Sequence, residues 1–111
     1  MAAAAPLAWS PAPEERALYA RWFELAGGAR TGSLSGEEAV KFLLQTGLQR
    51  ETLREVWNLS DPAKRGALAF DGFCVALRLV SLAQSGIPPS RDAFLLYYAT
   101  PLPPPRFALP T

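Results

Sequence analysis

The sequence predicts an all-α domain built from two helix-loop-helix units, and three observations carry this prediction. Half of the 111 residues are hydrophobic, and the commonest of these, Ala and Leu, favour helices. Ten of the eleven prolines lie outside residues 14–87, so this stretch can hold several uninterrupted helices. Within it, two segments of similar pattern recur at a spacing of 34 residues. A chain of this length buries one hydrophobic core, so we expect a single compact unit.

The first two helices have clear limits in the sequence. Pro13 and the two acidic residues after it suit a helix start, and Gly27 suits its end. Apolar residues recur every three or four positions between these limits. The buried face that they predict consists of Ala17, Leu18, Tyr19, Trp22, Phe23, Leu25 and Ala26. Ser35 and Glu38 have the spacing of a capping box, which predicts a second helix over about 36–46.

Three further helices are predicted downstream. The stretch QRETLREVWNL places Leu53, Val56 and Trp57 on one helical face. The stretch FCVALRLVSLA, which begins at Phe73, contains a single charged residue, so we expect this helix to be the most buried element. Ser90 is a suitable N-cap for a short last helix through AFLLYYA.

These elements divide the chain into three parts. The segment TPLPPPRFALP cannot continue a helix, so we expect it to run extended and to pack back on the body. The predicted parts are a flexible lead-in over 1–10, a domain over 11–100 with units at 14–47 and 48–87 and a short helix at 90–98, and a Pro-rich tail or linker over 101–111.

Both loops carry a glycine two residues before a leucine, Gly32 with Leu34 and Gly66 with Leu68. An EF-hand loop turns sharply at such a glycine and then pairs a short strand with its partner loop. We therefore expect Leu34 and Leu68 to meet in a short antiparallel strand pair that joins two EF-hand-like units. One unit cannot bury its apolar faces alone, which explains why the chain contains two.

Neither loop has the side chains that calcium needs. In a 12-residue EF-hand loop, side-chain ligands come from positions 1, 3, 5, 9 and 12. These positions hold Gly27, Ala29, Thr31, Ser35 and Glu38 in the first loop, and Asp61, Ala63, Arg65, Ala69 and Gly72 in the second. Each set offers one carboxylate, and the capping box already uses Glu38, so we expect neither calcium nor any other cofactor. We expect Lys64 and Arg65 to occupy the space of the missing cation.

The composition excludes most enzyme chemistries. The chain has no His and one Cys, which removes His-based acid–base catalysis, Cys–His nucleophiles, an internal disulfide and the usual zinc sites. A net charge of +1 argues against binding to a nucleic-acid backbone. Because the sequence shows neither a signal peptide nor a run of about 18 apolar residues, we expect a soluble intracellular protein. Cys74 is expected to be a small buried hydrophobe.

Three stretches carry a family resemblance: LSGEEAVKFL, then L-x-x-V-W-N-L-S-D from Leu53 to Asp61, then F-x-x-A-L-R-L-V from Phe73 to Val80. With these stretches in order, residues from about 14 to 105 resemble an EH domain, the paired EF-hand module of endocytic adaptor and scaffold proteins. The resemblance implies a non-catalytic, monomeric module of a larger scaffold. Such a module binds Asn-Pro-Phe peptides of endocytic proteins, and neither nucleic acid nor a small-molecule substrate, in a groove between the second and third helices.

The resemblance also implies a set of peptide-binding residues and a cytoplasmic location, peripheral at the plasma membrane, coated pits or endosomes. The implied residues are Gly36, Ala39, Val40, Leu43, Leu53, Arg54 and Trp57. Arg54 stands where the family often has a small residue, so it is expected to narrow the groove or to contact an acidic residue beside the motif. Without the resemblance, Trp57 is interpreted first as a core residue, because a Trp at helical spacing is more often part of the buried core than of a ligand pocket.

A competing hypothesis is recognition of anionic membrane lipids by Arg50, Lys64 and Arg65. Charged residues on exposed helical positions are usually only solvated surface, which weakens this hypothesis. A calcium sensor is disfavoured by the ligand count. Ala69 replaces the acidic residue that the family usually has before the fourth helix, so we expect that helix to start without a side-chain cap.

Overall fold

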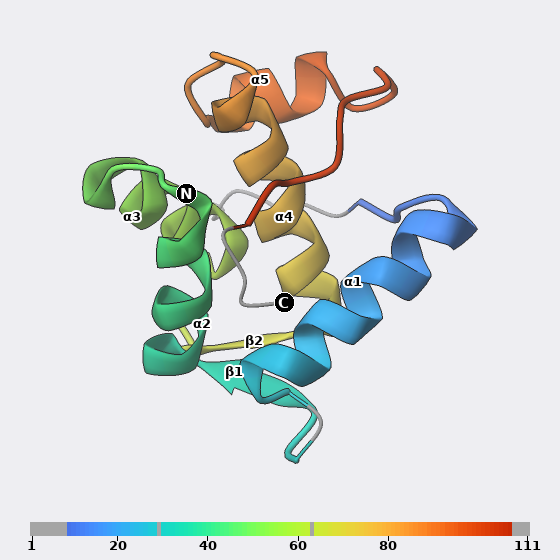
Figure 1. The fold of residues 1–111 in the computed structure, drawn as a ribbon. Helices are drawn as coiled ribbons and strands as arrows, with labels where there is room; N and C mark the ends of the chain where they lie inside the picture. Colours follow the sequence, from blue (N-terminus) through green and yellow to red (C-terminus); the bar gives the residue numbers. More distant parts are fainter. Residues whose placement is uncertain (1–8, 29, 63, 108–111) are drawn as a thin grey trace, which may run out of the picture.

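The computed structural model describes residues 9–28, 30–62 and 64–107, so most of the predicted lead-in and the end of the predicted tail lie outside the described residues. The elements follow one another around a central helix (Figure 1). In chain order they are α1 (Pro13–Ala26), β1 (Ser33–Ser35), α2 (Gly36–Leu43), the 3-10 turn η1 (Leu44–Thr46), α3 (Arg50–Ser60), β2 (Ala67–Ala69), α4 (Phe70–Gln84) and α5 (Arg91–Leu96). The predicted helical fold with two helix-loop-helix units is confirmed.

A short antiparallel strand pair joins the two units at the bottom of the view in Figure 1. Leu34 of β1 lies opposite Leu68 of β2, as predicted, and both side chains are buried. Gly32 and Gly66 precede the strands with φ of 82° and 76°, a conformation that side chains with a Cβ rarely adopt. The glycines therefore supply the sharp turns, and the two leucines connect the strands to the core.

The capping box at the start of α2 is present as predicted. The Ser35 hydroxyl accepts a hydrogen bond from the Glu38 backbone N–H at 3.2 Å, and the Glu38 carboxylate accepts one from the Ser35 N–H at 3.0 Å. The end of this helix tightens into η1 before Gly47, whose φ is 78°. The Thr46 hydroxyl donates a hydrogen bond to the Leu43 carbonyl at 2.6 Å. This side chain satisfies a carbonyl at the end of the helix that has lost its α-helical N–H partner.

The Glu38 contact predicts a dependence of stability on pH. The Ser35 backbone N–H, and to a lesser extent Arg30, hold the pKa of Glu38 below its ordinary value of 4.5. Because the folded pKa is the lower one, the contribution is present above the unfolded pKa and is lost as pH falls through the folded pKa. We expect thermal unfolding to show wild type more stable than Glu38→Gln at neutral pH, with the gap closing below pH 4.5. A gap independent of pH would contradict this assignment.

The buried face of α1 is narrower than predicted. Tyr19 and Phe23, four residues apart, are buried, and Leu18, Trp22 and Ala26 pack partly against the core beside them. The expectation that Ala17 and Leu25 belong to this face is wrong, since both are exposed. Each stands two residues from a buried aromatic. At about 100° per residue, such positions point to nearly opposite sides of a helix.

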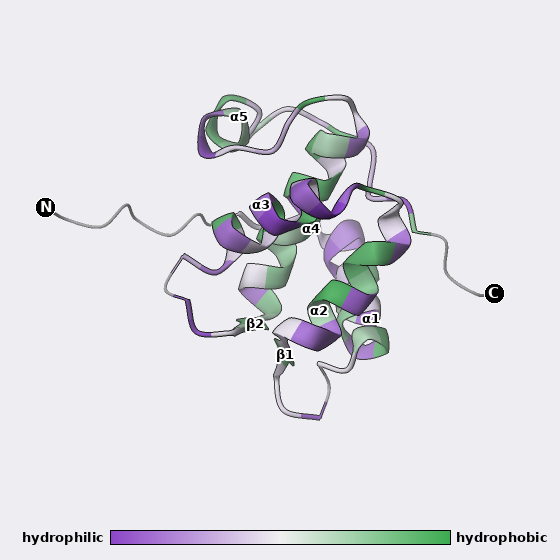
Figure 2. Cartoon of the chain, turned by 90° about the vertical axis from the view of Figure 1, so that its left-hand side faces the viewer, coloured by the Kyte–Doolittle hydropathy of each residue, from purple (hydrophilic) through white to green (hydrophobic). Residues whose placement is uncertain are grey.

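Helix α4 forms the centre of the core, as predicted. Its side chains from Phe73 to Leu82 are all buried, and the other helices surround it in Figure 1. Cys74 lies in this run, and burial raises the pKa of its thiol to about 11, which leaves it a protonated packing group. The helix begins after Ala69 without a side-chain cap, again as expected. The outer helices α2 and α3 carry both hydrophilic and hydrophobic positions (Figure 2).

The C-terminal segment packs back on the body, which confirms that part of the predicted fold. Its ring contacts are made by Phe107, whose centroid lies 4.9 Å from that of Trp22 and 4.6 Å from that of Phe42. The Gln84 side chain pairs with the backbone of Arg106, accepting from its N–H at 2.7 Å and donating to its carbonyl at 2.8 Å. The tail therefore bridges α1, α2 and α4.

Candidate functional site

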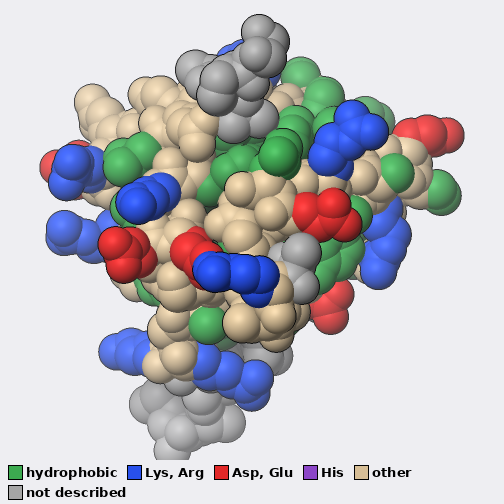
Figure 3. Space-filling model, turned by 60° about the horizontal axis from the view of Figure 1, so that its bottom comes forward, with side chains coloured by type: hydrophobic (Ala, Val, Ile, Leu, Met, Phe, Trp, Pro, Cys, Tyr) green, Lys and Arg blue, Asp and Glu red, His purple; other side chains and the backbone are tan. Residues whose placement is uncertain are grey.

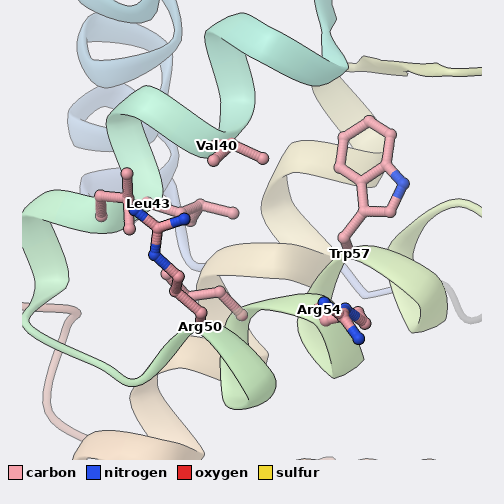
Figure 4. A pocket seen from close by; sticks show the side chains of 7 residues that line it. Val40, Leu43, Arg50, Arg54 and Trp57 are labelled. Atoms are coloured by element: carbon pink, nitrogen blue, oxygen red, sulfur yellow. The ribbon is translucent and has the colours of Figure 1, made fainter.

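A cavity of about 240 Å³ opens between α2 and α3. Its lining comes from Val40, Leu43 and Leu44 on one side and from Arg50, Leu53, Arg54 and Trp57 on the other. The residues of each side recur at helical spacings of three and four, so each helix contributes one continuous stripe. Figure 4 shows Trp57 at one end of this groove and Arg50 at the opposite end.

The floor of the groove is buried and its walls are open. Leu43 and Leu53 are 2% and 5% exposed, whereas Val40 and Leu44 on the wall are 46% and 40% exposed. Trp57 is half-buried and packs against the core with part of its ring. An apolar cavity of about 150 Å³ is sufficient to hold benzene. The groove therefore has room for an aromatic side chain together with a smaller apolar group.

Gly36, the first residue of α2, lies close to the Trp57 indole. A Cβ built on Gly36 would lie 3.7 Å from Cζ2 of Trp57, so the start of α2 runs close beside the ring. This contact places the beginning of α2 near the end of α3, while the end of α2 faces the beginning of α3. The two helices thus run antiparallel along the groove, and the indole forms the wall at one end.

Five of the seven residues that the resemblance implied line this cavity: Val40, Leu43, Leu53, Arg54 and Trp57. Gly36 lies behind the indole rather than in the lining. Ala39 is 1% exposed and belongs to the core, one residue around the helix from Val40. The sequence reasoning missed Leu44, although its spacing of four from Val40 could have indicated it. It assigned Arg50 to lipid binding, and the structure places it in the groove.

The three basic residues proposed for lipid binding do not gather in one patch. Arg50 is the first residue of α3, whereas Lys64 and Arg65 lie in the loop beyond its other end. An 11-residue helix is about 16 Å long, which separates them. On the face shown in Figure 3, Lys and Arg side chains are spread out among Asp and Glu.

Asp61, and not the basic residues, closes the second loop. Its carboxylate oxygens accept hydrogen bonds from the backbone N–H groups of Arg65 at 3.0 Å and Gly66 at 2.9 Å, and the side chain is buried. Lys64 and Arg65 are both exposed, so the expectation that they occupy the cation's space is wrong. A short carboxylate can satisfy the turn's N–H groups directly, and long cationic side chains gain more from water.

The described part of the tail leaves the groove open. No residue of 101–107 is among those that line the cavity. Phe107 instead contacts Phe42, a residue of α2 that does not line the cavity. Among the described residues, none of the helices combines the length and apolar character that a bilayer crossing requires.

Comparisons with known proteins agree with this architecture. A family model described as the EH domain matches residues 12–93. The second EH domain of AtEH1/Pan1 superposes with a TM-score of 0.78 at 31% identity, covering 92% of this chain and 98% of that one. The N-terminal EF-hand domain of Arabidopsis thaliana AtEH1/Pan1 gives a TM-score of 0.73 at 33% identity, over 83% of this chain and 95% of that one.

Curated relatives are much longer than this chain. EH domain-containing protein 1 of Arabidopsis thaliana is 38% identical over 79 residues, which are 71% of this chain and 14% of that protein. The actin cytoskeleton-regulatory complex protein pan1 of Aspergillus terreus is 36% identical over 88 residues, 79% of this chain and 6% of that protein. An uncharacterized calcium-binding protein of Schizosaccharomyces pombe is 41% identical over 75 residues, 68% of this chain and 7% of that protein. The similarity therefore concerns one module of each relative.

Proposed function

The chain belongs to the EH domain family, and from this membership and its groove we propose that it binds Asn-Pro-Phe-type peptides as an adaptor module. The family is one of protein-interaction modules and not of enzymes. The observation that carries the proposal is the open apolar cavity between α2 and α3, with a buried leucine floor and the Trp57 indole as its end wall.

The chemistry of the motif suits this cavity. A Phe side chain fills the space between Leu43, Leu53 and Trp57, and the neighbouring Pro covers the exposed Val40 wall. An Asn-Pro turn holds the peptide in a folded shape before binding, which lowers the entropic cost of ordering it. With a single aromatic anchor, we expect a binding free energy of about 5 to 7 kcal/mol, which corresponds to a Kd between about 10 and 200 micromolar.

We place this module in endocytic scaffolds on the cytoplasmic side of the plasma membrane, at coated pits or endosomes. Two similar proteins are named as actin cytoskeleton-regulatory complex proteins, and this supports an adaptor role in membrane-associated actin regulation. Weak binding by one module becomes strong when several motifs and modules are linked, because the second contact forms at a high local concentration.

Titration of the 15N-labelled chain with an Asn-Pro-Phe peptide tests the proposal. We expect saturable shifts at the amides of Leu43, Leu53 and Trp57, and none of this size with an Asn-Pro-Ala peptide. We propose that binding needs no metal, because Asp61 and Glu38 already accept hydrogen bonds from their own loops. The affinity should therefore be equal in calcium and in chelator. Shifts confined to another surface would rule out the groove.

A further inference from the structure

Two arginines line the groove beside its apolar floor. Arg50 and Arg54 are four residues apart on α3, so they follow one another along one face of the helix. In Figure 4 the Arg50 side chain extends toward α2 beside Leu43, at the end of the groove farthest from Trp57. Arg54 lies next to Trp57 in the same view, so cationic side chains border the groove along α3 and only Arg50 lies at the end farthest from the indole.

Neither arginine has a carboxylate partner within the described residues. The ion pair that the described residues contain joins Arg30 to Glu38 at 3.5 Å and involves neither arginine of the groove. Glu51 and Glu55 follow the two arginines directly, and both are exposed, but they point about 100° away around the helix and do not line the cavity. The lining contains no acidic residue, so its cationic charge is uncompensated.

The position of Arg50 is also locally unfavourable. It is the first residue of α3, where the helix dipole favours negative charge, and the N-cap Gln49 makes no side-chain hydrogen bond there. Local rules of this kind are broken at functional sites, where another requirement outweighs the cost in stability. The missing partner has the chemistry of a carboxylate, which guanidinium groups bind through paired hydrogen bonds.

We propose that Arg50 and Arg54 select peptides that carry Asp or Glu beside the aromatic anchor, at the Arg50 end of the groove. This inference rests on the proposed function and adds the sequence preference of the same site. The anchor binds the apolar floor in any such peptide, and the acidic flank distinguishes strong ligands from weak ones. Because only Arg50 lies at the end farthest from Trp57, the flank of the motif that runs toward Arg50 carries the larger preference.

Calorimetric titration with six peptides tests the preference. Each contains Asn-Pro-Phe, with two Asp, two Ser or two Lys placed either before or after the motif. On the flank that runs toward Arg50, we expect the Asp peptide to bind about threefold to tenfold more tightly than the Ser peptide and the Lys peptide to bind more weakly, with a smaller difference on the other flank. The difference should shrink when the salt concentration is raised from about 20 mM to about 500 mM, since exposed charges are then screened.

The arginines are tested with a charge-matched pair of variants. In Arg50→Gln with Arg54→Gln, the ratio of the affinities for the Asp and Ser peptides should fall to about one, whatever happens to the affinity that the two peptides share. In Arg21→Gln with Arg65→Gln, which changes the net charge equally at exposed residues outside the cavity lining, the advantage should remain. Circular dichroism of both variants checks that the helices are intact.

The possible outcomes separate this inference from the proposed function. Equal binding of Asp, Ser and Lys peptides, with shifts still at Leu43 and Trp57, overturns the acidic preference and leaves peptide binding in place. An Asp advantage that survives in Arg50→Gln with Arg54→Gln also overturns it. If no peptide binds, both the acidic preference and the proposed peptide-binding function are refuted. If phosphatidylserine vesicles shift the NMR signals of Arg50 and Arg54 and acidic peptides do not, the two arginines form a lipid contact instead.

Discussion

Trp57→Ala is expected to reduce binding of an Asn-Pro-Phe peptide by at least about thirtyfold, to a Kd in the millimolar range. The indole is the end wall of the groove and contacts the buried floor, so its removal opens one side of the space for the anchor. Aromatic residues in such positions contribute about 2 kcal/mol or more to binding. The measurement is calorimetric or NMR titration, because the chain contains three Trp residues and fluorescence would not isolate this one.

Trp22→Ala provides a matched control for the loss of an indole. Trp22 is half-buried like Trp57, but it stacks on Tyr19 at 5.6 Å and contacts Phe107 at 4.9 Å, away from the groove. Its removal should lower stability by about 1 to 3 kcal/mol and leave peptide affinity within about twofold. Peptide binding that persists in Trp57→Ala would refute the assignment of the pocket, whatever the control does.

Arg78→Met is expected to lower the free energy of unfolding by about 3 kcal/mol, with a fall of roughly 10 °C in Tm. Arg78 is 6% exposed, and its guanidinium donates hydrogen bonds to the carbonyls of Tyr97, at 2.7 Å, and Thr100. Its charged group also lies 4.9 Å from the Trp9 ring centroid. One side chain of α4 thus holds both the segment before α1 and the segment after α5.

Urea unfolding and limited proteolysis measure the two consequences of this change. Methionine keeps the apolar volume of the stem but leaves the carbonyls without their donor, so the segment after α5 should be cleaved faster. Peptide affinity should not change, since Arg78 does not line the groove. The exposed Arg21→Ala on α1 serves as the control, with an expected change within about 0.5 kcal/mol. Equal stability of the two variants would contradict the anchoring role.

Much of the site could be predicted because its residues follow helical spacing. Leu53 and Trp57 share a face of α3, and Leu43 faces them from α2, so the family resemblance and the periodicity agreed on the groove. The place of Arg50 in the cavity lining could not be predicted in this way. A charged residue at the start of a helix has the same local pattern whether it faces solvent or a cavity, and only the neighbouring helix distinguishes these cases.

Elements with local causes followed directly from the order of the residues. The capping box of Ser35 and Glu38, the left-handed glycines before the strands and the apolar run of α4 depend on residues within a few positions of one another. Two features could be read only from the folded chain: which stripe of α1 is buried, and that Arg78 binds carbonyls about twenty residues away. These features depend on packing between distant segments, and the repeat of apolar residues specifies that a face is buried but not what lies opposite to it.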